Sequence, residues 1–170
     1  MDTIRFRSVA GVGLMLLLLY GLVNVGAAIF VPMALERNGG QGGGSSGVII
    51  GRAPEEAMLG TTYARLHAEN PKLDQLLVDS MVGMCSQMMA MGVLFLAVAW
   101  FGARRGAAWA PWALLACAIV WIPYYFVIGA DLARFGATDA GSYAWMTTIF
   151  AAPAVVGVVL LIVGTRRRAA

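Results

Sequence analysis

Four long uncharged apolar stretches constrain this chain more than any other feature. They cover residues 9–35, 80–103, 107–130 and 143–164. Because an α-helix rises about 1.5 Å per residue, about 20 apolar residues cross the ~30 Å hydrocarbon layer of a membrane. Lipid offers no hydrogen bonds to an open backbone, and the alternating pattern of a membrane β-barrel is absent. The sequence therefore predicts an all-α fold, a four-helix transmembrane bundle that forms one integral membrane domain.

The composition agrees with a lipid environment. Of the 170 residues, 60% are hydrophobic and 12% are charged, whereas roughly a quarter of the residues in an ordinary soluble domain carry charge. A soluble chain of this length would need a far more charged surface. The net charge of +3 does not indicate nucleic-acid binding, because the basic residues flank the apolar stretches instead of forming a stripe.

The placement of arginine predicts how the chain threads through the membrane. The segments before the first stretch, between the second and third, and after the fourth together hold seven arginines and one acid, Asp2. The two other connecting segments hold five basic residues and eight acids. Because basic flanks stay in the cytoplasm, we expect both termini there. Alanine- and valine-rich stretches with arginine preferred over lysine favour a bacterial chain, so the predicted location is the bacterial cytoplasmic (inner) membrane, crossed in several passes.

Residues 36–79 form the one sizeable connection predicted outside the membrane. This extracytoplasmic loop begins with a glycine-rich linker at 38–47, which lacks the Gly-Lys-Ser/Thr ending of a phosphate loop. The segment 54–69 starts with Pro-Glu-Glu and carries apolar residues at helical spacing, which predicts an amphipathic interfacial helix. Asn70 and Pro71 predict the start of a further helix that continues into the second apolar stretch.

Several polar and aromatic side chains fall at a similar depth in the outer half of the predicted bundle. Helical rise counted from each outer boundary places the following roughly 5–12 Å below it: Asn24, Ser86, Gln87, Tyr124, Tyr125, Thr147 and Thr148. Trp121 and Asp131 share one helix face with Tyr124 or Tyr125. Polar groups in lipid turn toward the bundle interior, where they find partners, and Tyr20 shares a helix face with Asn24. We therefore predict an outward-facing polar layer whose candidate ligand-binding residues are Asn24, Gln87, Trp121, Tyr124, Tyr125, Thr148 and Asp131. Interhelical hydrogen bonding that serves packing alone is the alternative, and the sequence leaves both open.

Methionines form a stripe along the second apolar stretch, with a cysteine beside them. Thioether and thiolate groups suit Cu(I), so a copper site is a weak alternative, with the candidate ligands Met81, Met84, Cys85 and Met88. The same spacing is typical of a packing seam filled by methionine, which is the preferred interpretation. No metal and no other cofactor is therefore predicted.

Residues that usually carry catalysis are sparse in this chain. Cys85 and Cys117 are its two cysteines. Their predicted depths differ by about 10 Å, whereas a disulfide joins Cα atoms within about 7 Å. The one histidine, His67, lies outside the predicted spans, and Asp131 has no second acid or histidine beside it. We assign no catalytic residue, and a non-enzymatic role is favoured.

Prolines and small residues inside the apolar stretches predict local packing. Pro123 and Pro153 remove backbone hydrogen bonds and predict kinks in the third and fourth spans. Ser86-x-x-x-Ala90 and Pro153-x-x-x-Gly157 match the small-residue pattern of close helix contacts in membranes. Such contacts serve a bundle or a homodimer equally well.

The segment between the second and third stretches resembles a known hairpin. It reads Trp100-Phe-Gly-Ala-Arg-Arg-Gly-Ala-Ala-Trp-Ala-Pro-Trp-Ala-Leu114. An apolar helix that ends in Trp-Phe-Gly, followed by an Arg-Arg-Gly turn, resembles uncharacterised small four-helix bacterial membrane proteins that are loosely DoxX-like. This resemblance covers these residues and the layout of the spans, and it does not extend to the glycine-rich insertion. It implies a fold class and no activity.

These observations lead to one preferred function and two alternatives. The preferred function is a non-enzymatic integral membrane protein, either an accessory subunit or a binder of a small lipophilic molecule. The first alternative is a membrane enzyme or redox component that acts on a quinone or a lipid. The second is a transporter or channel protomer. Expected partners are membrane lipid, a lipophilic small molecule, further copies of the chain or a larger membrane complex, and no nucleic acid.

Overall fold

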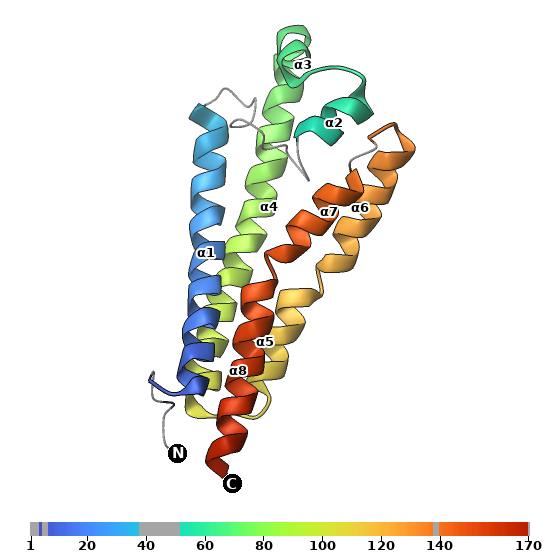
Figure 1. Cartoon of the computed structure of the whole chain (residues 1–170). Helices are drawn as coiled ribbons and strands as arrows, with labels where there is room; N and C mark the ends of the chain where they lie inside the picture. Colours follow the sequence, from blue (N-terminus) through green and yellow to red (C-terminus); the bar gives the residue numbers. More distant parts are fainter. Residues whose placement is uncertain (1–3, 5–6, 38–51, 138–139, 170) are drawn as a thin grey trace. The chain divides into compact units, whose positions relative to one another are not determined.

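The computed structural model describes residues 4, 7–37, 52–137 and 140–169, and every regular element in these ranges is helical. The predicted all-α class is therefore confirmed for these ranges, while the predicted linker at 38–47 lies outside them. For some helical residues, His67 among them, only the backbone is described. In chain order (Figure 1) the elements are α1 (Val9–Arg37), α2 (Arg52–Leu59), α3 (Tyr63–Glu69), α4 (Pro71–Ala97), the π-helical η1 (Val98–Gly102), the 3-10-helical η2 (Ala103–Arg105), α5 (Ala110–Ile119), α6 (Ile122–Arg134), α7 (Ala140–Ile149) and α8 (Ala152–Ala169).

Three helical stretches in the described ranges are long and apolar enough to cross a membrane. They are Val9–Ala34, Asp79–Arg105 and Ala110–Arg134, of 26, 27 and 25 residues. At about 1.5 Å per residue each reaches beyond the ~30 Å hydrocarbon layer. The fourth predicted span, 143–164, corresponds to the shorter helices α7 and α8, and the apolar part of α8 is Ala152–Arg166. The helices are thus those of a membrane protein, and the number of four crossings stays a prediction.

Prolines divide the third and fourth predicted spans where steric reasoning places the break. A proline ring clashes with the carbonyl four residues earlier and cannot donate a hydrogen bond to it. α5 ends at Ile119, four residues before Pro123, and α7 ends at Ile149, four residues before Pro153. Each predicted span is therefore two helices instead of one kinked helix. α1 continues through Pro32, so a proline permits a break without imposing one.

Two helices, α2 and α3, replace the single amphipathic helix predicted at 54–69, and that prediction is corrected. The chain turns at Gly60, whose φ of +64° lies in the left-handed region that favours glycine. Thr62 then caps α3, because its side-chain oxygen accepts a hydrogen bond from the Arg65 N–H at 3.3 Å. The Gly-Thr-Thr sequence combines a helix stop with a helix cap, a local signal that the apolar spacing concealed.

The predicted helix start at Asn70 is confirmed. α4 begins at Pro71, and the Asn70 side-chain oxygen accepts a hydrogen bond from the Lys72 N–H at 3.2 Å. From there the chain stays helical through α4, η1 and η2. Gly106 then ends η2 with a φ of +75°, which allows the tight turn toward α5.

The chain forms two compact units, each assembled from segments that are distant in the sequence. Unit 1 comprises Met1–Gly26, Met88–Trp121 and Phe150–Ala170. Unit 2 comprises Ala27–Gln87 and Ile122–Ile149. α1 and α4 each contribute to both units, and the proline breaks coincide with the unit boundaries.

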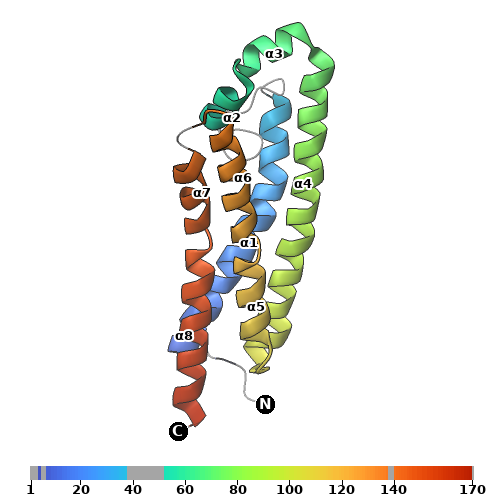
Figure 2. The same cartoon turned by 90° about the vertical axis from the view of Figure 1, so that its right-hand side faces the viewer.

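Unit 1 is built around small and aliphatic side chains from α1, α4, α5 and α8. Figures 1 and 2 both show α5 beside α8. The core includes Ala10, Leu14, Leu17, Phe95, Ala99, Leu114, Ala118, Ala154, Val158 and Leu161. Outward-facing residues of the same helices are apolar too, since Leu19 and Val159 are 57% and 53% exposed. An outer surface of this kind suits lipid.

α1 and α8 approach each other so closely that their contact requires glycine. A Cβ added to Gly13 would lie 2.5 Å from the Gly157 carbonyl oxygen and 2.6 Å from the Leu161 nitrogen. A Cβ added to Gly164 would lie 2.3 Å from the Ala10 nitrogen. Helices in lipid associate through such contacts of small residues, because lipid tails are as apolar as the side chains. Gly157 belongs to a predicted small-residue pattern, whereas its partner Gly13 was not predicted.

Unit 2 pairs α6 with α7, which lie side by side in both views (Figure 2). The rings of Phe126 and Trp145 meet edge to face, with centroids 5.1 Å apart and planes at 79°. Leu132 and Ala137 are buried together, with Ile128 packed against them. α2 also packs against α6, so the described part of the connection at 36–79 belongs to this unit.

Candidate functional site

Tyr20, Asn24 and Trp121 form a polar cluster inside unit 1. The Tyr20 hydroxyl is hydrogen-bonded to the side chains of Asn24 and Trp121. Since an indole N–H can only donate, the Tyr20 oxygen accepts from Trp121. Asn24 Nδ2 also donates to the Tyr20 carbonyl oxygen at 2.8 Å. All three side chains are half-buried. The hydrogen bond between Tyr20 and Trp121 joins α1 to the turn after α5, within a unit whose core is otherwise apolar.

The spacing along α1 and the approach of α4 position this polar cluster. Tyr20 and Asn24 are four residues apart and therefore lie on one face of α1. The Tyr20 ring packs on Phe95 of α4, with ring centroids 5.1 Å apart. A Cβ added to Gly92 of α4 would lie 3.2 Å from the Val25 nitrogen and 3.4 Å from the Asn24 Cβ. Glycine at this position therefore lets α4 come close to the polar face of α1.

Trp121 reaches the polar cluster because α5 ends just before it. Residues 120–121 form a turn between α5 and α6, and the next helix carries Pro123 in its first turn. Trp121 thus sits at the break that the proline permits. Cys117, four residues earlier, packs on the same core as Tyr20. The local fold therefore places an indole donor, and not a further aliphatic residue, opposite α1.

Asn24 keeps hydrogen-bonding capacity that its described neighbours do not use. A carboxamide offers two N–H donors and a carbonyl oxygen with two lone pairs. Among the described residues, its bonds are those with the carbonyl oxygen and the hydroxyl of Tyr20. Two of its four positions are thus open within the described part of the chain. Open positions are costly in hydrocarbon, because no water is present to fill them. Because both of its N–H groups donate to Tyr20, the open positions are the two lone pairs of its carbonyl oxygen. A molecule with a hydroxyl group would donate to them.

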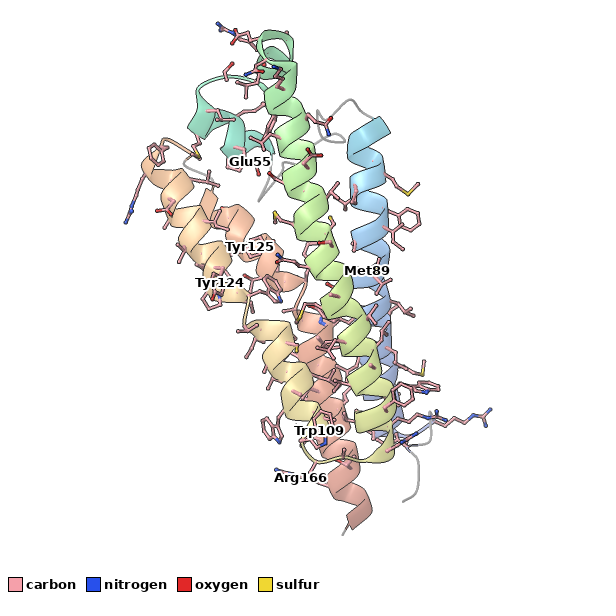
Figure 3. All side chains as sticks on the ribbon, turned by 180° about the vertical axis from the view of Figure 1, so that it is seen from behind. Glu55, Met89, Trp109, Tyr124, Tyr125 and Arg166 are labelled. Carbon is pink, nitrogen blue, oxygen red and sulfur yellow. The ribbon has the colours of Figure 1, made fainter. Side chains whose placement is uncertain are left out.

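Four predicted binding residues lie in unit 2 with different exposures. Tyr124 is 68% exposed and Gln87 is also exposed, whereas Tyr125 and Thr148 are half-buried. Successive helical residues are rotated by about 100°, so Tyr124 and Tyr125 leave α6 in different directions (Figure 3). The shared depth predicted for these side chains therefore does not give them a shared orientation.

Asp131, the last predicted binding residue, is a surface group of unit 2. Its carboxylate accepts from Arg134 Nη1 at 3.2 Å, and the two side chains are 57% and 77% exposed. Exposed pairs of this kind contribute about 0–1 kcal/mol. Of the seven predicted binding residues, the structure thus joins Asn24 and Trp121 through Tyr20. The other five are described with unit 2.

The four candidate Cu(I) ligands have different environments. Met81 and Cys85 are buried, Met88 is half-buried and Met84 is 44% exposed. Cys85 and Cys117 are both free thiols. Within the described ranges, no group of three or more His, Cys, Asp or Glu residues could hold a metal ion. The copper alternative gains no support from these positions and stays a prediction.

Glu55 is a buried carboxylate that the sequence indicated only as part of a helix start. It lies on α2 (Figure 3), is 4% exposed, and accepts a hydrogen bond from the Tyr63 hydroxyl of α3. Glu56 Oε1 accepts from the Tyr63 N–H at 3.0 Å. Tyr63 is therefore held at both ends, which fastens α3 to α2 across the turn at Gly60. The acids were visible in the sequence, but their partner beyond the turn was not.

No family model, no curated protein and no solved structure matches this chain. The resemblance of residues 100–114 to loosely DoxX-like proteins therefore stays a prediction. Function has to be argued from the geometry of the polar cluster and of its surroundings, because a helical fold by itself does not imply an activity.

Proposed function

We propose that this protein is a multi-pass membrane protein that binds a small lipophilic molecule and catalyses no reaction. The bound molecule carries a hydroxyl group, which donates to the carbonyl oxygen of Asn24 in the polar cluster. The observation that carries this proposal is that Asn24 is half-buried in an apolar helix and keeps two hydrogen-bonding positions beyond its bonds with Tyr20. Trp121 and Tyr20 then act as positioning residues, because their mutual hydrogen bond joins α1 to the turn after α5.

The proposal includes four crossings of a bacterial cytoplasmic membrane, with both termini in the cytoplasm. Contacts inside unit 1 support it. The Ile4 N–H donates to the Arg104 carbonyl oxygen at 3.0 Å, and Gly164 lies against Ala10. The segment that leads into α1, the 3-10 helix η2 and the end of α8 therefore meet at one end of unit 1. These are the segments that carry the arginines, as expected of flanks that stay in the cytoplasm.

Ligand retention tests the role of Asn24. The protein is purified in a mild detergent and incubated anaerobically with decylubiquinol, which has ring hydroxyls, or with squalene, which has no polar group. Native mass spectrometry should show retained decylubiquinol and no retained squalene. Asn24→Leu should lower the retention about tenfold, since one lost hydrogen bond is worth about 1 kcal/mol or slightly more. Gly26→Ala, in the same helix and facing open space, should keep it.

The opposite results are equally clear. If Asn24→Leu retains decylubiquinol but unfolds at a lower temperature, the polar cluster serves packing alone and the binding proposal is wrong. A separate measurement tests the topology, with green fluorescent protein or alkaline phosphatase fused after Ala170. Fluorescence without phosphatase activity is expected, and the reverse result would place the C-terminus outside. The accessory-subunit, enzyme, redox and transporter alternatives, together with self-association, stay predictions.

A further inference from the structure

A cavity of ≈ 240 Å³ lies in unit 1 between the start of α5 and the last turns of α8. Its walls include Pro111 and Trp112 from α5, and Leu161, Thr165 and Arg166 from α8. Ile162 of α8, Ala103 of η2 and the turn residues Gly106, Ala107 and Ala108 complete it. Ligand sites for drug-sized molecules usually measure about 300–1,000 Å³, so this cavity suits a smaller group such as a lipid headgroup.

Apolar and polar residues both line the cavity. Leu161 is fully buried, whereas Arg166 is exposed at the end of the apolar part of α8. Trp112 is 59% exposed, and neighbouring Trp109 is 58% exposed. Figure 3 shows Trp109 and Arg166 at the same end of unit 1. Tryptophans and a cation beside an apolar helix end are typical of the boundary between hydrocarbon and headgroups.

The charge around this end of unit 1 is strongly positive. The residues of unit 1 include seven arginines and a single acid, Asp2. The turn that lines the cavity follows Arg104 and Arg105, whose guanidinium groups lie 4.1 Å and 5.6 Å from the ring centroids of Trp100 and Phe101. These cation–π contacts hold both arginine side chains against aromatic rings at this end of unit 1. An anionic group is the complement of this surface.

Thr165 adds a preference among anionic headgroups. Its hydroxyl donates to the carbonyl oxygens of Leu161 and Ile162, at 2.9 Å each. Because its hydrogen is directed at its own helix, the oxygen offers the cavity lone pairs and no donor. Lone pairs repel phosphate oxygens but accept from a hydroxyl. The cavity therefore combines a cation for a phosphate at Arg166 with an acceptor for a headgroup hydroxyl at Thr165.

We propose that this cavity binds the headgroup of an anionic phospholipid that carries free hydroxyls, as phosphatidylglycerol does. Arg166 contacts the phosphate, the Thr165 oxygen accepts from the glycerol headgroup, and the acyl chains follow the apolar surface past Ile162. This site rests on the membrane insertion of the proposed function, but it is separate from the polar cluster and does not depend on Asn24.

Competition among lipids tests this site in the full chain. The purified protein is placed in micelles that contain equal amounts of phosphatidylglycerol, phosphatidylcholine and phosphatidic acid, and retained lipid is measured by native mass spectrometry. Phosphatidylglycerol should exceed phosphatidylcholine about fivefold, the preference that one arginine near an anionic surface provides. Arg166→Gln should abolish this preference. Arg105→Gln, an equal charge change at the same end but outside the cavity wall, should keep it.

A second variant separates the cavity from charge alone. Ala108 is an exposed residue of the cavity wall, and Ala108→Phe should block entry of the headgroup while every arginine is retained. Equal losses in Arg105→Gln and Arg166→Gln, or full retention in Ala108→Phe, would show diffuse attraction and overturn the site. Retention of phosphatidic acid equal to that of phosphatidylglycerol would overturn the hydroxyl preference. In a further sample inorganic phosphate is added, and displacement of phosphatidylglycerol by inorganic phosphate alone would overturn the lipid assignment. Asn24→Leu should leave phosphatidylglycerol retention unchanged, which separates this test from that of the proposed function.

Discussion

Alanine at Gly13 tests the close contact between α1 and α8. The added Cβ would lie 2.5 Å from the Gly157 carbonyl oxygen and 2.6 Å from the Leu161 nitrogen. Non-bonded heavy atoms ordinarily approach to about 3.5 Å. Both obstructing atoms belong to the backbone of α8, so no side chain can rotate away, and the two helices must separate by about 1 Å. Overpacking of a tight contact costs typically about 1–3 kcal/mol, and we expect Gly13→Ala to lie near 3 kcal/mol.

Thermal unfolding in one fixed detergent measures this cost. A loss of about 3 kcal/mol should lower the Tm by about 6–12 °C in a chain of this length. Gly26→Ala is the matched control, because it lies in the same helix and its added Cβ meets no atom within 4 Å. The control should stay within about 2 °C of the original protein. If the Gly13→Ala and Gly26→Ala proteins unfold within about 2 °C of each other, the glycine contact does not hold α1 against α8.

Three further substitutions test local features of the fold. Gly60→Ala puts a Cβ at a φ of +64° and should cost about 1 kcal/mol, seen as faster amide hydrogen exchange in α2 and α3; unchanged exchange would contradict the strain. Tyr63→Phe removes the hydroxyl that donates to buried Glu55 and should cost about 1–3 kcal/mol in thermal unfolding. Adding Glu55→Gln to the Tyr63→Phe protein should recover part of this loss, because the carboxylate left without its donor is replaced by a neutral group. An undiminished loss in the double variant would argue against a direct contact. Pro123→Ala supplies a backbone N–H four residues after Ile119. If the proline causes the break, this new amide should bond to the Ile119 carbonyl oxygen and exchange its hydrogen slowly. Exchange as fast as in a free peptide would mean that the proline is not the cause.

Much of the secondary structure could be predicted because its causes are local. Helix length follows from the run of apolar residues, and the helix after Asn70 starts where its side chain and Pro71 place it. The breaks before Pro123 and Pro153 depend on a clash that reaches back only four residues. The turn at Gly60 had an equally local signal, but periodicity over a longer window gave the opposite prediction.

The candidate site was less predictable, because depth in a membrane can be counted along a helix and rotation cannot. Trp121 was placed on a helix face with Tyr124 or Tyr125, whereas the structure joins it to Asn24 through Tyr20, which the sequence only placed on the same face as Asn24. Tyr124 and Tyr125 share a depth as well, yet one is exposed and the other half-buried. Because one residue turns a helix by about 100°, a shift of one position exchanges interior for surface.

By itself the sequence determined that this chain is helical, that its longest helices suit lipid, and where its arginines gather. Tertiary structure alone decided that Gly13 meets Gly157, that Tyr63 reaches Glu55, and that a cavity opens beside Arg166. The physical reason is the range of the forces involved. Composition and proline sterics act between residues that are near in the chain. Each of these three contacts instead needs two helices to meet at one point along their length and with the right faces toward each other. That geometry depends on how all the side chains of the unit pack together.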